Sequence, residues 1–136
     1  EVHGLRAQSG ALYSVLSELY SNALDHGVLG LDSSLKRDAS GFARYYSERN
    51  QRLDELNSGH VRVHVHVTPH GDGGRLVIEV EDSGQGFDVA RVLARPADSN
   101  RLSGRGVSLV RQLSHQACWS DDGRSARGEF FWEALA

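Results

Sequence analysis

Two segments of the 136-residue chain carry polar side chains at spacings that suit nucleotide chemistry. Glu18 and Asn22 are four residues apart, so on a helix they would share one face, where an amide oxygen can bind Mg²⁺ and a carboxylate can accept a proton. Asp82 follows an apolar run and opens a loop that contains Gly84 and Gly86. An acidic group there can accept a hydrogen bond from an exocyclic amine, and the glycines let the backbone approach a flat ring closely.

A third segment, S-G-R-G at residues 103–106, suits phosphate binding. Gly104 and Gly106 lie where a helix is predicted to begin, and the free amide N–H groups at a helix start attract anions. Lys36 is the only lysine and the chain has no P-loop motif, so phosphate contacts must come mainly from arginine, backbone amides or a metal ion.

The element that would carry Glu18 and Asn22 is a helix predicted over residues 9–26, with Gly27 as its stop. Apolar residues recur along it with the spacing of an amphipathic helix, at Leu12, Val15, Leu16, Leu19 and Ala23. The opposite positions form a polar row of Ser14, Glu18, Asn22 and Asp25. The helix is therefore predicted to bury one side and to offer the other to a ligand.

The remaining elements alternate between helices and paired strands. They are predicted as a helix over 42–56 within a helical insertion at 28–59, strands over 61–68 and 76–80 joined by a turn at 69–74, a helix over 106–116, and strands over 117–120 and 128–135. The valines of the 61–68 strand alternate with polar residues, which predicts one buried face. This order favours an α+β fold, a two-layer sandwich with helices on one face of a mixed, mainly antiparallel sheet.

Composition limits the class of protein. With 15 Lys plus Arg against 18 Asp plus Glu the net charge is −3, so a nucleic-acid partner is not expected, and no apolar run is long enough for a membrane span. The length suits a single domain over 1–136. Cys118 is the only cysteine, which favours a cytoplasmic setting, and the lack of methionine predicts a piece of a longer protein with upstream regulatory domains.

In order and spacing, the three segments resemble the N box and the two glycine boxes of the GHKL ATPases, the Bergerat-fold family that includes gyrases, Hsp-ninety-type chaperones, MutL-type repair proteins, histidine kinases and anti-sigma-factor serine kinases. The resemblance covers nearly the whole chain and implies ATP and Mg²⁺ as cofactors. It implies that Glu18 is the general base, Asn22 the Mg²⁺ ligand and Asp82 the adenine-binding acid. The implied nucleotide-binding positions of the two glycine boxes are Gly84, Gly86, Ser103, Gly104 and Gly106.

Within that family the short connection between the glycine boxes favours kinases. The string E-L-Y-S-N-A-L-D-H-G is similar to serine kinases that phosphorylate antagonists of anti-sigma factors, and similar domains are fused to bacterial response regulator and phosphatase proteins. The resemblance therefore implies a serine protein kinase with an anti-sigma-factor antagonist as substrate. The alternatives are the catalytic domain of a histidine kinase and a non-catalytic nucleotide-binding module that sequesters a regulator; a homodimer is a further candidate assembly.

The chain departs from the family pattern at two positions. Asp25 stands where these kinases commonly have a basic residue, and Leu102 stands where some serine kinases have an arginine. Arg101 and Arg105 are nearby candidates for stabilising the transferring phosphoryl group as catalytic residues. The insertion at 28–59 is longer than the link of a minimal domain, and we expect it to contribute to partner recognition.

Other conspicuous residues are expected to be structural. His64 and His66 share a strand face and could suggest a metal site, but a solvent-facing sheet surface is the preferred interpretation. Cys118 is expected to be a small buried residue, and Trp119 and Trp132 are expected to pack in the core or on the sheet.

Overall fold

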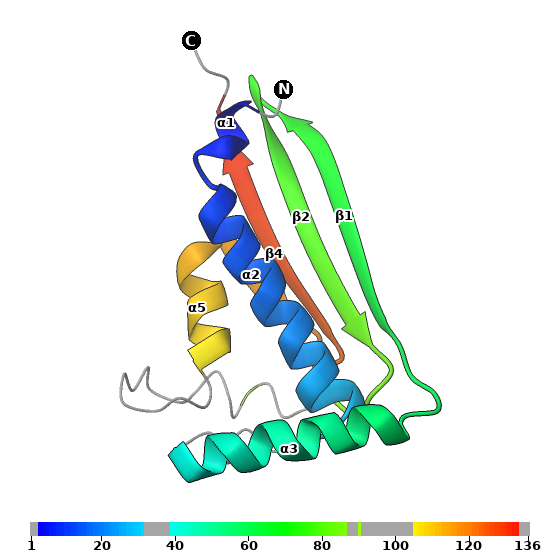
Figure 1. The fold of residues 1–136 in the computed structure, drawn as a ribbon. Coiled ribbons are helices and arrows are strands. Elements are labelled where there is room, and N and C mark those ends of the chain that lie inside the picture. Colours follow the sequence, from blue (N-terminus) through cyan, green and yellow to red (C-terminus); the bar gives the residue numbers. More distant parts are fainter. Residues whose placement is uncertain (1–2, 32–38, 87–89, 91–104, 134–136) are drawn as a thin grey trace.

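The computed structural model describes residues 3–31, 39–86, 90 and 105–133. In chain order its elements are α1 (His3–Arg6), α2 (Ser9–Ser21), the π-helix η1 (Asn22–Val28), α3 (Ala39–Glu55), β1 (Val61–His70), β2 (Gly73–Asp82), α5 (Arg105–Leu113), β3 (Gln116–Trp119) and β4 (Ser125–Trp132). Helices α2 and α5 lie on one face of the sheet, and α3 crosses the end at which β2 finishes (Figure 1). The predicted α+β two-layer sandwich is confirmed.

The sheet has four strands in the order β1-β2-β4-β3, and every neighbouring pair is antiparallel. All strand pairs in the described part of the chain are thus antiparallel, in agreement with the expected mainly antiparallel sheet. His70 pairs with Gly73, so β1 and β2 are joined by a two-residue turn. Gly71 in that turn has a φ of 57°, a conformation in which glycine meets no steric penalty.

The main core lies between the sheet and the two packed helices. Alternate residues of β2 face the helices, so their apolar side chains share one side of the strand. The buried members of this core include Val15, Leu19, Leu76, Ile78, Val80, Val110 and Phe130. Trp132 is buried with them and Trp119 packs against them, as the sequence predicts. This packing fixes α2, and with it the predicted ligand-facing side of the helix, relative to the end of β2.

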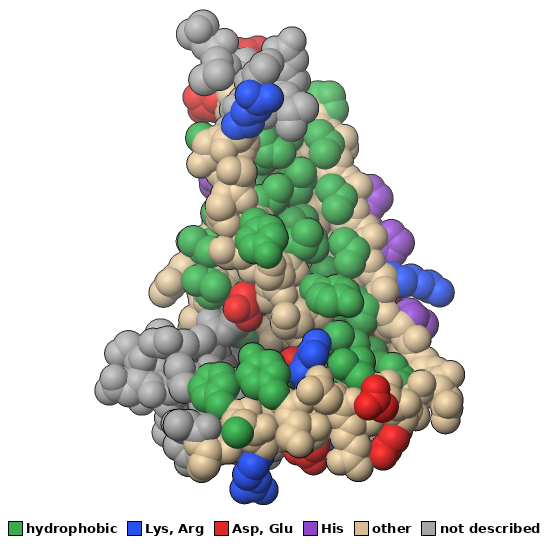
Figure 2. All heavy atoms as spheres, in the orientation of Figure 1, with side chains coloured by type: hydrophobic (Ala, Val, Ile, Leu, Met, Phe, Trp, Pro, Cys, Tyr) green, Lys and Arg blue, Asp and Glu red, His purple; other side chains and the backbone are tan. Residues whose placement is uncertain are grey.

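The valine face of β1 is not buried, which corrects the prediction for this strand. Val63, Val65 and Val67 are 43%, 53% and 59% exposed, although they pair with buried residues of β2. The reason is that α2 lies over β2 and β4 and leaves the edge strand uncovered (Figure 1). Figure 2 shows hydrophobic side chains gathered along this side of the molecule.

Several predicted boundaries also change. The first α-helix ends at Ser21 and continues as a π-helix through Val28, so Gly27 lies inside the helical segment and does not stop it. The helix predicted over 106–116 ends at Leu113, and the last strand runs over Ser125–Trp132 instead of 128–135. Cys118 is exposed and not buried, because its neighbours Ala117 and Trp119 face the core in the edge strand β3. None of the described helices is both long and apolar enough to cross a bilayer.

Candidate nucleotide site

Glu18 and Asn22 lie one turn apart on a continuous helical segment. Asn22 has helical backbone angles, and its N–H donates to the carbonyls of Glu18 and Leu19. Because residues four apart lie on the same side of a helix, the two polar side chains project from a common face. Both residues are partly buried. The predicted side-by-side geometry is therefore present, whereas the roles in metal binding and proton transfer stay predictions.

Helical hydrogen bonding changes at Asn22. In η1 the bonds span five residues, and beyond it the N–H of Leu29 donates to the carbonyl of Leu24 at 2.9 Å. Such π-helical turns are rare and occur frequently at functional sites. Here the wider turn begins at Asn22, the predicted metal ligand. The sequence pattern predicts this ligand but not the π-helical turn.

Gly27, inside η1, brings the helix into direct contact with Asp82. A Cβ on Gly27 would lie 2.5–2.6 Å from the carboxyl atoms of Asp82, closer than real Cβ contacts allow. A Cβ on Gly84 would overlap the carbonyl oxygen of Gly27. Both glycines are therefore required for the close approach of η1 to the loop after β2, and η1 continues the helix that carries Glu18 and begins with Asn22.

Asp82 is the last residue of β2 and is held at both backbone and side chain. Its N–H donates to the carbonyl of Arg124 at 2.9 Å, and its Oδ1 accepts the N–H of Gly84 at 2.8 Å. Burial raises the pKa of its carboxyl group, while the Gly84 N–H and the charge of Arg124 act in the opposite direction. Within the described residues Oδ2 accepts no hydrogen bond, so one carboxylate oxygen remains for a ligand.

The loop that follows Asp82 is supported from its other side by the β3–β4 turn. Gly86 has a φ of 78°, and a Cβ there would overlap the carbonyl oxygen of Asp122. The carboxylate of Asp122 accepts the N–H of Arg124 at 3.0 Å and the hydroxyl of Ser120 at 2.7 Å, and these bonds lower its pKa. The loop is thus enclosed between η1 and this turn.

The third predicted segment is described only at its end. Arg101, Ser103 and Gly104 lie outside the described residues, while Arg105 and Gly106 form the start of α5. This start lies toward the end of α2 at which η1 begins with Asn22 (Figure 1). The backbone of α5 therefore begins where the phosphate-binding segment is expected.

A buried cluster that the sequence pattern does not predict lies beside this site. Its centre is Asp25, a member of the predicted polar row that is only 6% exposed. Its Oδ2 accepts the hydroxyl of Tyr45 and its Oδ1 accepts Nε of Arg49, each at 2.8 Å. Burial, followed by this hydrogen bond, raises the pKa of Tyr45, and the bond to Asp25 raises the pKa of Arg49. The available signal was the four-residue spacing of Tyr45 and Arg49 in the predicted insertion helix.

The histidines of β1 behave as a sheet surface. The rings of His64 and His66 stack with centroids 6.3 Å apart, and His64 Nε2 lies 3.1 Å from Glu81 Oε1. Among the described residues no cluster of three or more metal-binding side chains exists.

The residues present fit an adenine nucleotide. A Cβ at Gly27 would clash with Asp82 and one at Gly84 would clash with Gly27, and Oδ2 of Asp82 accepts no hydrogen bond from the described residues, as a group that binds an exocyclic amine requires. The chain belongs to the histidine kinase-, DNA gyrase B- and HSP90-like ATPases, whose family it matches over residues 7–132. Binding of ATP is thus implied, and the fold agrees with the Bergerat architecture of that family.

A similar protein is the gliding motility regulatory protein of Myxococcus xanthus, which is 34% identical over 97 residues. The match covers 71% of this chain but 10% of that protein, so the chain spans about a tenth of the length of its relative. No solved structure gives a significant match.

Proposed function

We propose that this domain is an Mg²⁺-ATP-dependent protein kinase that transfers phosphate to a serine of a partner protein. The observation that carries the proposal is the contact between Gly27 and Asp82. It sets the predicted base-binding carboxylate beside the helical segment that bears Glu18 and Asn22. A single site then holds a group for the base, an oxygen ligand for a metal ion and a carboxylate for a proton.

Each group has a distinct task in this proposal. Oδ2 of Asp82 accepts a hydrogen bond from the adenine amine, while Oδ1 stays on Gly84. The side-chain oxygen of Asn22 would hold Mg²⁺, which supplies charge neutralisation at the phosphates when bound. Glu18, one turn earlier, would accept the proton of the attacking serine hydroxyl, whose oxygen bonds to the γ-phosphorus as the bond to the bridging oxygen breaks and ADP leaves. Such a transfer depends mainly on positioning and on neutralising charge, so few side chains are needed.

The remaining nucleotide contacts follow from the resemblance. Gly86, Ser103, Gly104 and Gly106 would shape the backbone around the phosphates, and Arg101 or Arg105 would neutralise the developing charge. For the partner we propose an anti-sigma-factor antagonist. Two observations support a signalling role: the similarity of residues 18–27 to the serine kinases of that system, and the name of the relative, a regulatory protein.

The test is transfer of labelled phosphate from ATP to a candidate antagonist protein, with its serine-to-alanine version as a substrate control. We expect an acid-stable phosphoserine product that is lost in Glu18→Ala, while this variant still binds ATP. Glu55→Ala, a matched change at an exposed position of α3, should behave as the wild type. An acid-labile product would favour a histidine kinase, and tight binding without any product would favour a sequestering module.

A further inference from the structure

We propose that Arg49 is a positioning residue for the nucleotide site: together with Tyr45 it holds Asp25, and through it the π-helical turn between Asn22 and Gly27. The inference rests on the proposed nucleotide site and assigns a role in it to the insertion helix α3. It differs from the partner-recognition role that we expected for the insertion, because it requires no partner.

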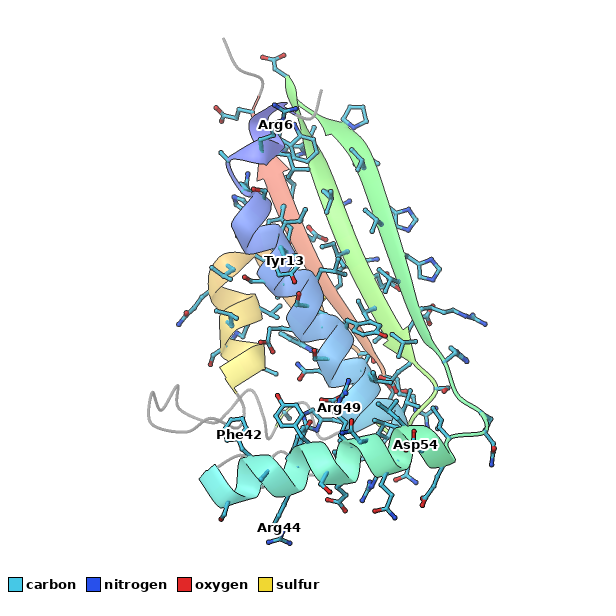
Figure 3. The ribbon with its side chains drawn as sticks, viewed as in Figure 1. Arg6, Tyr13, Phe42, Arg44, Arg49 and Asp54 are labelled. Atoms are coloured by element: carbon cyan, nitrogen blue, oxygen red, sulfur yellow. The ribbon has the colours of Figure 1, made fainter. Side chains whose placement is uncertain are left out.

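The cluster around Asp25 ties two elements together. The carboxylate of Asp25, a residue only 6% exposed, is costly to bury unless donors surround it, and both donors found among the described residues, the Tyr45 hydroxyl and Arg49 Nε, come from α3. Figure 3 shows Arg49 on the side of α3 that faces the end of α2. Within the part of the chain that the structure describes, removing Arg49 would leave the buried carboxylate with the Tyr45 hydroxyl as its one donor, so we expect η1 to lose its present position.

A second residue of α3 holds the end of the same turn. Nη1 of Arg52 donates to the carbonyl oxygens of Leu29 at 2.6 Å and Gly30 at 2.9 Å. Carbonyl groups at the end of a helix lack partners within the helix, and here α3 supplies them. Tyr45 also packs with Leu29 and Leu31 in a second small core. The insertion therefore contacts η1 at its middle and immediately after its end.

The π-helical turn matters because it decides which residue faces Asp82. A return to α-helical bonding would rotate the residues after Asn22 by up to about 100°, since one residue of a 3.6-residue turn corresponds to that angle. A residue with a side chain would then approach the carboxyl group, where even a Cβ on Gly27 does not fit. Loss of the contacts that Tyr45 and Arg49 make with Asp25 should therefore disturb both the base-binding carboxylate of Asp82 and the orientation of Asn22.

The test compares Arg49→Met with Arg44→Met, the same change at an exposed position of the same helix that points away from the body of the molecule (Figure 3). Binding of Mg²⁺-ATP and of adenosine is measured by calorimetry, and unfolding temperatures are recorded alongside. Partners that orient metal ligands typically contribute 10–100-fold in affinity, and on that scale we expect Arg49→Met to weaken the binding of both ligands by about 10–100-fold. Arg49→Lys keeps a cation beside Asp25 and should restore much of this loss, whereas Arg44→Met should bind as the wild type.

Three results would overturn the proposal. One is wild-type affinity in Arg49→Met despite a lower unfolding temperature, which would show a purely structural role. Another is an equal loss in Arg44→Met. The third is a loss for ATP but not for adenosine, which would indicate that Arg49 binds the phosphates directly. If Arg49→Met fails to fold, Tyr45→Phe removes the hydroxyl that donates to Asp25 and is judged by the same criteria, with a smaller expected loss.

A ligand-free measurement separates this inference from the proposed function. Amide hydrogen exchange in Arg49→Met should accelerate by about tenfold or more in peptides covering residues 22–30 and 82–86, while residues 116–132 keep wild-type rates. If the wild type binds no Mg²⁺-ATP, the proposed function fails, but the exchange data still decide whether α3 holds the turn. Unchanged exchange in both peptides would refute the proposal that Arg49 holds η1, even if ATP binds.

Discussion

Replacement of Asp82 by Asn separates the two interactions of its carboxylate. The variant has nearly the same shape, and its side-chain oxygen can still accept the N–H of Gly84, as Oδ1 does now. The amide nitrogen, however, replaces the charged oxygen that is free of hydrogen bonds within the described residues. A donor would then face the donor of the adenine amine. Hydrogen bonds to charged groups contribute about 1.5–3 kcal/mol, which corresponds to a loss of about ten- to hundredfold in affinity for ATP.

The same variant should be more stable than the wild type at neutral pH. Burial raises the pKa of Asp82 above its ordinary value of 3.8, so the folded protein holds this proton more tightly than the unfolded chain. Stability contributed by the protonated form is present below pH 3.8 and is lost as the pH rises through the folded pKa. Asparagine does not ionise, so the variant avoids this loss, and its advantage at pH 7 should disappear as the pH falls toward 3.8.

Calorimetric titration with Mg²⁺-ATP and thermal unfolding across this pH range measure both effects. Asp54→Asn, at an exposed position of α3 (Figure 3), is the matched control and should alter neither. ATP affinity at the wild-type level in Asp82→Asn would refute the assignment of the base-binding group. A variant less stable than the wild type at pH 7 would refute the reasoning about the buried carboxylate.

Two further comparisons test the packing around the site and the sheet. Alanine is favoured over glycine in helices, yet Gly27→Ala should destabilise the protein by about 1–3 kcal/mol because the added Cβ meets Asp82. Gly10→Ala, whose Cβ would have nothing within 4 Å, should instead stabilise the protein by about 0.5–1 kcal/mol. Chemical denaturation measures both free energies of unfolding. Val65→Thr, on the exposed face of β1, should change the free energy of unfolding by no more than about 0.5 kcal/mol. Val80→Thr, at a residue that is 2% exposed, should lower it by about 1–3 kcal/mol, and equal losses would contradict the observed exposure.

The periodic elements could be predicted from sequence because periodicity reports directly on burial. The apolar stripe of the first helix and the alternation in 76–80 both correspond to buried side chains in the observed core. The relative placement of Glu18 and Asn22 followed from helix geometry alone. The contact of Gly27, in the same helical segment, with Asp82 could be inferred only from the family resemblance, because it joins residues more than fifty positions apart in sequence.

The features that escaped prediction depend on what covers each residue. The alternating valines of β1 specify an apolar face, but α2 lies over β2 and β4 and leaves that face exposed. The polar position of Asp25 suggested solvent exposure, but α3 covers it and supplies donors. The π-helical turn at Asn22 has no periodic signal in seven residues, since a single wide turn is set by the contacts around it.

Asp25 and Asp82 differ in their hydrogen bonds and therefore in their roles at the candidate site. Both oxygens of Asp25 accept hydrogen bonds from α3, so this carboxylate has little capacity for a ligand and serves to hold η1. Asp82 has one oxygen on Gly84 and one without a hydrogen bond in the described part of the chain. A partly buried carboxylate with spare accepting capacity and a raised pKa is typical of a binding group. The acidic residue at position 25, a departure from the family pattern, is thus explained by the insertion that pairs with it.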